Sequence, residues 1–343
     1  MACDVIIDNF DKTQWEHYAK GFADYSIYQT WAYQQVRAEM DNQKISRIVI
    51  KDGDSDVATM CQVRIKCIRP FRFKIGYVQW GPLFRDGDGK ITCTRETLEK
   101  LRQAYLGGTV HVLRLVPNLL TDEREQTFAE MLQEAGFYRV PILKPYRSFV
   151  LPTDDSEEEI RKRLRKSFRR DLKKAEKAGI EIRQGHDREF CKILEDLYLA
   201  SIKRKGFKGL DPQEFVKTQS MLSSSEKMNI IVAYLDGEPI AAHLASNLGD
   251  TGVVLLAASN EKGLTCGASY LIWYKGAVAA CCAGMKRYDL GGIDPDSNPN
   301  VYQFKSRMGG KECFHIGAFE AYSSSHVKII WRICERIYRH IKK

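Results

Sequence analysis

Two segments of the chain show the same order of apolar and polar positions. In each, two runs rich in β-branched and other apolar residues flank an Asp-Gly turn, at residues 46–65 and 229–248. Asp-Gly between such runs is a strong hairpin signal, because its residues tolerate the positive φ angles that a tight turn needs. Each segment is therefore predicted to form an antiparallel hairpin.

Helices and further strands are predicted around both hairpins in the same order. Apolar residues at helical spacing precede each hairpin, and a strand, a helix and a second strand follow it. A strand–helix–strand series implies parallel pairing, so each half is expected to be a mixed sheet flanked by helices. The predicted helices cover residues 29–40, 94–105, 187–204, 211–222 and 267–283, and the strands after the hairpins cover 75–84, 111–117, 251–259 and 287–292.

The length of 343 residues indicates two domains of an α+β protein. Apolar residues make up 44% of the chain, enough for two large cores. The boundary is predicted near residues 146–152, which divides the chain into domains of residues 1–150 and 151–343. A helix over residues 156–178 is expected to open the second domain, since Leu164, Phe168 and Leu172 recur at helical spacing.

The net charge of +9 is concentrated in one part of that helix. Residues 161–177 contain ten Lys and Arg residues against two acidic ones. Such a concentration of positive charge favours a polyanionic partner, for example phosphates or nucleic acid. A solvated helix face would give the same pattern, so both interpretations remain open.

Several classes of protein lack their sequence signatures here. There is no dinucleotide-binding, P-loop or hydrolase-elbow motif. The ten cysteines and seven histidines have no metal-ligand or disulfide-framework spacing, so no metal site is predicted. The apolar stretch 263–285 contains Lys275 and is predicted to be a buried helix rather than a membrane span. The N-terminus does not resemble a signal peptide, and the expected location is the reducing cytoplasm.

Three short segments combine glycine turns with aromatic or basic residues: 76–82, 203–207 and 288–310. In the last of these, a predicted strand ends in Gly-Gly, and a short helix then presents Phe304 and Lys305. A lysine where a strand crosses to a helix can stabilise developing negative charge or hold a phosphate.

Taken in order on the doubled architecture, these segments resemble the FemABX family. The residues that carry the resemblance are Gln29-Thr-Trp, Gly81-Pro82, residues 175–180, Arg204-Lys-Gly-Phe, and Phe304-Lys305 with Gly309. The resemblance implies two tandem GNAT-like domains, that is, domains of the acyl-CoA N-acyltransferase fold. It also implies the activity of this family, which transfers an amino acid from aminoacyl-tRNA to the stem-peptide amine of a peptidoglycan precursor.

The resemblance further implies roles for individual residues. Lys305, in the segment 301–310, would be the catalytic lysine, with Phe304 shaping the pocket beside it. Arg204 would bind substrate phosphates from the second domain. In the first domain Arg37, Tyr77 and Asp86 would bind the acceptor substrate. Contacts with tRNA are expected from the basic helix, through Arg165, Lys166, Arg169, Arg170 and Lys173.

Two other functions remain as alternatives. A GNAT-type N-acyltransferase would use acyl-CoA on an amino sugar or cell-envelope polysaccharide precursor, and would need a phosphate-binding loop at a helix N-terminus. Residues 260–265 are the candidate loop, although they keep only the glycine of the usual pattern. A non-enzymatic RNA-binding module would depend on the basic helix alone.

The partners follow from the favoured function. They are a peptidoglycan precursor and tRNA, with aminoacyl-tRNA as donor substrate and no bound cofactor. No integral membrane segment is predicted, and peripheral contact with the cytoplasmic face of the membrane is possible.

Overall fold

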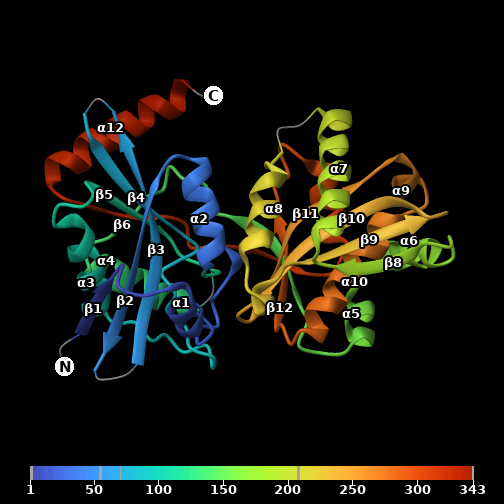
Figure 1. Cartoon of the computed structure of the whole chain (residues 1–343), viewed down its shortest axis with the longest axis horizontal. Helices are drawn as coiled ribbons and strands as arrows, with labels where there is room; N and C mark the ends of the chain where they lie inside the picture. The colour runs from blue at the N-terminus through green and yellow to red at the C-terminus, as the bar shows by residue number, and fades with distance from the viewer. Residues whose placement is uncertain (1–2, 54–55, 70, 122, 207–208, 342–343) are drawn as a thin grey trace. The chain divides into compact units, whose positions relative to one another are not determined.

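The computed structural model describes residues 3–53, 56–69, 71–121, 123–206 and 209–341 (Figure 1). The chain forms two compact units. Unit 1 comprises Met1–Asp24, Arg37–Tyr146 and His315–Lys343, and unit 2 comprises Tyr25–Val36 and Arg147–Phe314. Each unit contains a seven-stranded mixed sheet with helices packed on it, so the predicted α+β class is confirmed.

The two units divide the chain differently from the expected boundary at residue 150. The last part of the chain returns to unit 1, where β14 (Phe319–Tyr322) pairs with β5 (Val112–Val116) and β6 (Tyr138–Arg139). Near the N-terminus, Ile27 and Tyr33 are buried in an apolar cluster of unit 2. Local patterns locate strands and helices but not their distant partners, so neither exchange could be read from periodicity.

Unit 1 confirms the predicted first hairpin and parallel pair. Its strands are ordered β1-β2-β3-β4-β5-β14-β6, with β2–β3 antiparallel and β4–β5 parallel. Apolar side chains from α3 and α4 pack on one face of the sheet. The remaining bounds are β1 Cys3–Ile7, β2 Lys44–Asp52, β3 Asp56–Ile68, β4 Phe73–Gln79, α1 Lys12–Ala19, α2 Trp31–Met40, α3 Arg95–Leu106, α4 Glu123–Glu134 and α12 Ser325–Ile341.

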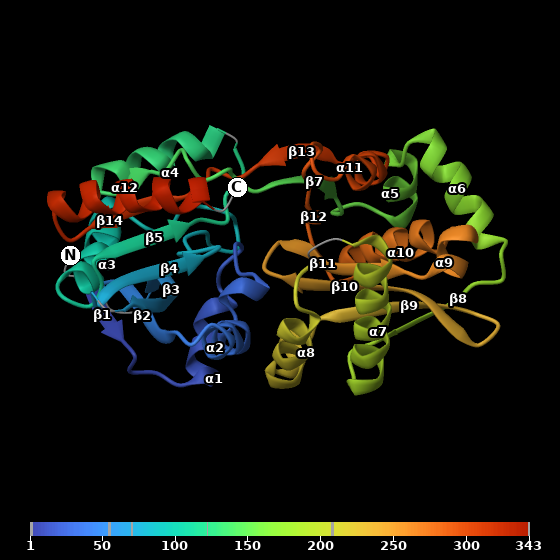
Figure 2. The ribbon, with the colours of Figure 1, turned by 90° about the horizontal axis from the view of Figure 1, so that it is seen from above.

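Unit 2 confirms the second hairpin and parallel pair. Its order is β13-β7-β12-β11-β10-β9-β8, with β9–β10 antiparallel and β11–β12 parallel. Helices α7 and α8 cover one face, and α5, α6 and α10 cover the other (Figure 2). The bounds are β7 Arg147–Pro152, β8 Glu181–Gly185, β9 Asn229–Leu235, β10 Glu238–Leu248, β11 Thr251–Ser259, β12 Arg287–Gly292, β13 Lys311–Phe314, α5 Glu157–Arg163, α6 Lys166–Glu176, α7 Arg188–Lys205, α8 Pro212–Met221, α9 Glu261–Thr265, α10 Ala268–Cys282 and α11 Pro299–Ser306, with single 3₁₀ turns at Ile27–Gln29 and Ser224–Glu226.

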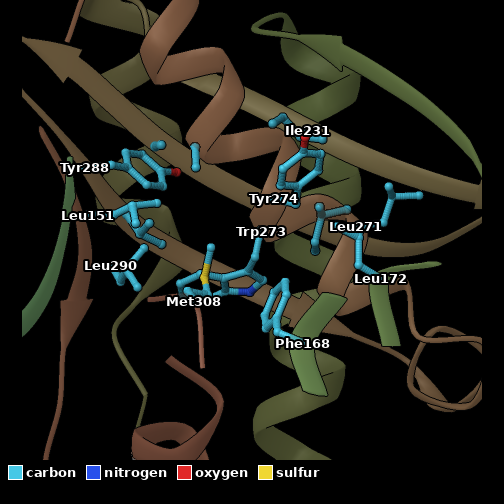
Figure 3. Close-up of a cluster of buried hydrophobic side chains, with 14 of the residues drawn as sticks. Leu151, Phe168, Leu172, Ile231, Leu271, Trp273, Tyr274, Tyr288, Leu290 and Met308 are labelled. Carbon is cyan, nitrogen blue, oxygen red and sulfur yellow. The ribbon is translucent and has the colours of Figure 1, made fainter. Parts of the chain in front are cut away.

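Helix α10 is the predicted buried helix of the apolar stretch. Trp273 and Tyr274 lie within a cluster that also contains Phe168 and Leu172 of α6 and Met308, which follows α11 (Figure 3). No helix of the described residues is long and apolar enough to cross a membrane.

The single basic helix predicted over residues 156–178 is wrong, because the segment forms two helices. Helix α5 ends at Arg163 and α6 begins at Lys166, while Leu164 and Arg165 are extended. The Arg165 amide donates to the Arg307 carbonyl at 2.9 Å instead of continuing the helix. Gly309 approaches so closely that a Cβ atom there would lie 2.0 Å from the Arg163 carbonyl oxygen. A tertiary contact with the chain after α11 therefore takes the place of helical hydrogen bonds.

Candidate active site

The parallel pair β11–β12 separates part-way along its length. Pairing runs only from Thr251 opposite Arg287 to Val253 opposite Asp289, although β11 continues to Ser259. The last carbonyl groups of β12 consequently point to other partners. Lys305 of α11 donates from Nζ to the Gly291 and Gly292 carbonyl oxygens, at 3.1 and 2.9 Å.

The backbone of β12 is shaped to receive this lysine. Gly291 has φ +79°, and a Cβ atom there would lie 3.0 Å from the Val254 carbonyl oxygen and 3.4 Å from Lys305 Nζ. The buried Asp289 carboxylate accepts the Gly291 amide at 2.8 Å, which holds the turn. A residue with a side chain at position 291 would therefore disturb both the turn and the lysine.

Lys305 is almost fully buried, with 7% of its surface exposed. Burial lowers the pKa of its ammonium group from 10.5 to about 8, while the Asp289 carboxylate acts in the opposite direction. Nζ also lies 5.4 Å from the centroid of the Trp273 ring, within cation–π range. Two of its three N–H groups donate to the strand carbonyls, and no described residue accepts a hydrogen bond from the third.

A pocket of about 270 Å³ lies on the far side of aromatic residues near this lysine, and Lys305 itself is not among its lining residues. Trp273 and Phe304 form part of its wall, and their rings make a T-shaped contact at 5.5 Å. The other lining residues come from the end of β11, from α7, α9, α10 and from α11: Lys205, Ala257, Ala258, Ser259, Leu264, Ser269, Asn300 and Val301. The wall is largely apolar, and Lys205 is its one basic residue among those that the structure describes.

Arg204 of α7 contacts the last residue of β11 and is not one of the residues that line the pocket. Its Nη2 donates to the Ser259 carbonyl oxygen at 2.7 Å. Lys205, its neighbour, is the basic residue that lines the pocket. Burial lowers the pKa of Lys205, and the Arg204 charge lowers it further. Phe207, the end of this predicted basic cluster, lies outside the described residues.

The candidate phosphate loop at residues 260–265 is folded as the short helix α9. The Asn260 side chain caps this helix by accepting the Gly263 amide at 2.9 Å. A Cβ atom at Gly263 would lie 2.3 Å from the Ile240 carbonyl oxygen, so the glycine is explained by close packing of α9 on β10. The glycine of the sequence pattern therefore has a structural role.

Tyr77, one of the residues predicted to bind the acceptor substrate, lies among arginines on the sheet face opposite α3 and α4. Tyr77 of β4 stands between its cross-strand partners Arg64 and Arg114. The Arg64 guanidinium lies 5.4 Å from the Tyr77 ring centroid and donates to Gln79 at 3.0 Å. Burial raises the pKa of Tyr77, and the charges of Arg64, Arg114 and Arg37 lower it. Arg37 itself pairs with Asp41 at 2.8 Å, one helical turn away.

Asp86 stabilises a turn in unit 1. Its carboxylate accepts the Lys90 amide at 2.8 Å, and its backbone pairs with Lys90 and Gly89. The buried acid near the Gly-Pro segment is instead Asp24, which accepts the amides of Phe84 and Arg85 at 3.1 and 3.0 Å. Burial raises the pKa of Asp24 to about 6, against the effect of the Arg85 charge.

The five predicted tRNA contacts lie on or directly before α6 and are exposed: Arg165, Lys166, Arg169, Arg170 and Lys173. The opposite side of α6 buries Phe168, Leu172 and Ala175. Arg170 forms an exposed ion pair with Asp171 at 3.1 Å. Much of the positive surface of α6 is thus available to solvent.

Sequence reasoning missed Trp273, Lys205 as a lining residue, and Asp24. Trp273 lies in an almost uncharged helix, where an aromatic residue is expected to be core. Lys205 is the last of three consecutive basic residues, and only its position around the helix decides that it, and not its two neighbours, lines the pocket. Asp24 lies far in sequence from the loop that it holds. Among the described residues, no group of three or more His, Cys, Asp or Glu side chains could hold a metal ion.

Comparisons with known proteins identify the fold. Residues 162–306 match the family model described as an acetyltransferase (GNAT) domain. The crystal structure of FemX superposes with a TM-score of 0.80 and 15% identity, over 92% of this chain and 97% of FemX. The chain has the fold of FemX. The comparison with curated proteins gives no match.

Two other solved structures share this fold more distantly. A tandem GNAT protein from the clavulanic acid biosynthesis pathway gives a TM-score of 0.51 at 10% identity, over 94% of this chain and 99% of that protein. The C-terminal domain of a putative lysylphosphatidylglycerol synthetase from Agrobacterium fabrum gives 0.53 at 10% identity, over 93% and 95%. The predicted tandem GNAT-like architecture is confirmed.

Proposed function

We propose that the protein is a cytoplasmic aminoacyltransferase that moves an amino acid from aminoacyl-tRNA to the stem-peptide amine of a peptidoglycan precursor. The observation that carries the proposal is the buried Lys305 near an aromatic-walled pocket, on a chain with the fold of FemX. The likeness to FemX and to the lysylphosphatidylglycerol synthetase domain supports aminoacyl transfer within the wider group of GNAT-fold acyltransferases.

In this reaction the acceptor amine attacks the ester carbonyl of the aminoacyl-tRNA. Negative charge develops on the carbonyl oxygen and then on the leaving ribose oxygen. A cation fixed in a site that excludes water stabilises these charges more strongly than it does in bulk water. With a pKa of about 8, Lys305 is mostly protonated at pH 7, and its third N–H group is the donor for this charge.

Basic residues in each unit are consistent with the two proposed substrates, tRNA and the peptidoglycan precursor. The exposed basic residues on and before α6 suit the phosphates of tRNA, and binding through several phosphates weakens steeply with salt. In unit 1 the arginines near Tyr77 that suit an anionic acceptor are Arg37 and Arg64. Guanidinium groups bind phosphate and carboxylate in bidentate geometry.

The decisive experiment is mass spectrometry of the products formed by the purified protein. It receives muropeptide precursors with either a pool of charged tRNAs or acetyl-CoA. The variants Lys305→Met and Lys203→Met are compared, because Lys203 is an exposed lysine of α7. We expect an added amino acid only with tRNA, and a rate lower by about 10²–10³ in Lys305→Met alone. Normal turnover in a folded Lys305→Met protein would contradict the assignment of the lysine.

A second candidate function is transfer of an acyl group from acyl-CoA. The observation that favours it is the match of residues 162–306 to an acetyltransferase domain model, together with Lys205 in the pocket wall. The same experiment distinguishes the two functions, since an added acetyl group that depends on acetyl-CoA would replace the first proposal. If no product formed with either charged tRNA or acetyl-CoA, both proposed functions would be contradicted for these acceptors.

A further inference from the structure

Helix α12 of unit 1 turns a polar face towards the sheet. Glu335 is buried and pairs with Arg114 at 2.8 Å, and Arg114 also pairs with the fully buried Glu320 of β14. Trp331, one turn before Glu335, donates to Glu320 at 3.1 Å. Lys328 lies over the Tyr138 ring at 3.3 Å. Ion pairs and aromatic contacts therefore hold this helix, rather than an apolar core.

The apolar residues of α12 point to solvent instead. Ile329, Ile330, Ile333 and Ile337 are 59%, 58%, 53% and 54% exposed. Their spacing of one, three and four residues places them on one side of the helix, about half a turn from Glu335. A surface helix of a globular protein normally buries its apolar stripe. This orientation leaves a continuous isoleucine stripe open.

Positive charge borders the stripe. Arg332 and Arg336 are exposed on α12, and their helical positions place them between the isoleucines and the buried face. The exposed His340 lies one turn after Arg336. An apolar stripe bordered by basic residues is typical of helices that lie in the plane of a membrane interface.

A second segment of unit 1 extends this surface. Phe71, at the tip of the β3–β4 hairpin, is 84% exposed and is flanked by the exposed Arg69 and Arg72. The hairpin lies beside α12, since the Phe73 ring stacks on Trp331 with centroids 5.7 Å apart (Figure 1). Two segments far apart in sequence thus present exposed apolar side chains with arginine neighbours at adjacent places.

We propose that α12 and the tip of the β3–β4 hairpin form a docking surface for an anionic lipid bilayer. The isoleucine stripe and Phe71 enter the headgroup region, and the arginines contact acidic headgroups. Since no helix of the described residues could span a membrane, docking is peripheral. A second copy of the chain fits less well, because pairing two such stripes would bring the Arg332 and Arg336 side chains of both copies together. The proposal is independent of the transferase activity.

Sedimentation of the full-length protein with lipid vesicles tests this surface. Vesicles of phosphatidylcholine alone are compared with vesicles that also contain phosphatidylglycerol. The double variant Ile333→Glu/Ile337→Glu removes the stripe at exposed positions, and Phe71→Ser removes the hairpin side chain. Leu199→Glu is the matched control, because Leu199 is 47% exposed on α7 of unit 2. Circular dichroism verifies that each variant is folded.

We expect binding that requires phosphatidylglycerol and weakens with added salt. The partition coefficient should fall at least about tenfold in the isoleucine double variant and several-fold in Phe71→Ser, while Leu199→Glu binds like the wild type. Absence of binding to either vesicle would overturn the proposal, as would equal losses in Leu199→Glu and the double variant. Dimerisation that is lost in the double variant, without vesicle binding, would assign the stripe to a second copy.

Discussion

The buried ammonium group of Lys305 should make the stability of unit 2 rise with pH in the alkaline range. Its pKa is about 8 in the folded protein against an ordinary value of 10.5. Between these two values the folded state has lost the proton while the unfolded state keeps it, so the free energy of unfolding increases with pH. A shift of this size corresponds to about 3 kcal/mol, accumulated from about pH 8 to pH 10.5.

Substitution of Lys305 by Met should remove this rise. The free energies of unfolding of wild type and variant are measured in urea at several pH values from 7 to 10.5. The difference between the two proteins is the quantity of interest, because other tyrosines and lysines titrate equally in both. At any single pH the comparison is less direct, since Met also leaves the Gly291 and Gly292 carbonyls without their donor. The change with pH does not contain this constant cost.

Lys203→Met provides the control, because Lys203 is exposed and its loss should leave the alkaline rise intact. If the wild-type and Lys305→Met profiles remained parallel from pH 7 to 10.5, the amine would not be desolvated. The argument from burial to charge stabilisation in the site would then fail as well.

Three further predictions concern the packing of both units. Burial lowers the pKa of His243 from 6.5 to about 3, so the wild type should lose stability as the pH falls from 7 to 4.5; His243→Gln should lose about 2.5 kcal/mol less over this range, measured in urea. Gly309→Ala should cost about 2 kcal/mol more than Gly284→Ala in the same assay, since both have positive φ but only Gly309 has a backbone atom within 3 Å of the added Cβ. Glu335→Ala should cost about 1–3 kcal/mol and speed proteolysis within α12, because Arg114 loses one of its two carboxylates.

The elements of both hairpins and of both strand–helix–strand series could be predicted because their signals are local. An Asp-Gly turn and alternating residues specify a hairpin without reference to the rest of the chain. The observed strand β11 covers the same residues, 251–259, as the predicted one. Helix α10 differs from its prediction by one residue at each end.

Features that depend on distant partners could not be predicted. Leu164 continues the helical pattern of residues 156–178, and only the approach of Gly309 and Arg307 explains the break. In the same way, β14 has the composition of an ordinary strand, and nothing local shows that it lies between β5 and β6. The inverted orientation of α12 depends on Arg114, which lies more than two hundred residues earlier.

The site residues divide along the same line. Lys305 was found through its resemblance and its Gly-Gly neighbours, but its burial and its two carbonyl partners depend on the end of β12. For Arg204 and Asp86 the side chains hold backbone groups, at Ser259 and Lys90. Those contacts give both residues structural roles, and their proposed contacts with substrate remain predictions.

The two units share one architecture but differ in how far their parallel strand pair stays hydrogen-bonded. In unit 1 the parallel strands β4 and β5 stay paired from Ile75–Val112 to Gln79–Val116, so their carbonyls are satisfied within the sheet. In unit 2 the equivalent ladder stops after three pairs, and the carbonyls released from it bind Lys305. Buried backbone carbonyls need donors, so the separation of the strands and the burial of a cation in unit 2 stabilise each other. In unit 1 the sheet is thus continuous at this pair, whereas in unit 2 it opens and holds the Lys305 ammonium group. We therefore assign the chemistry to unit 2.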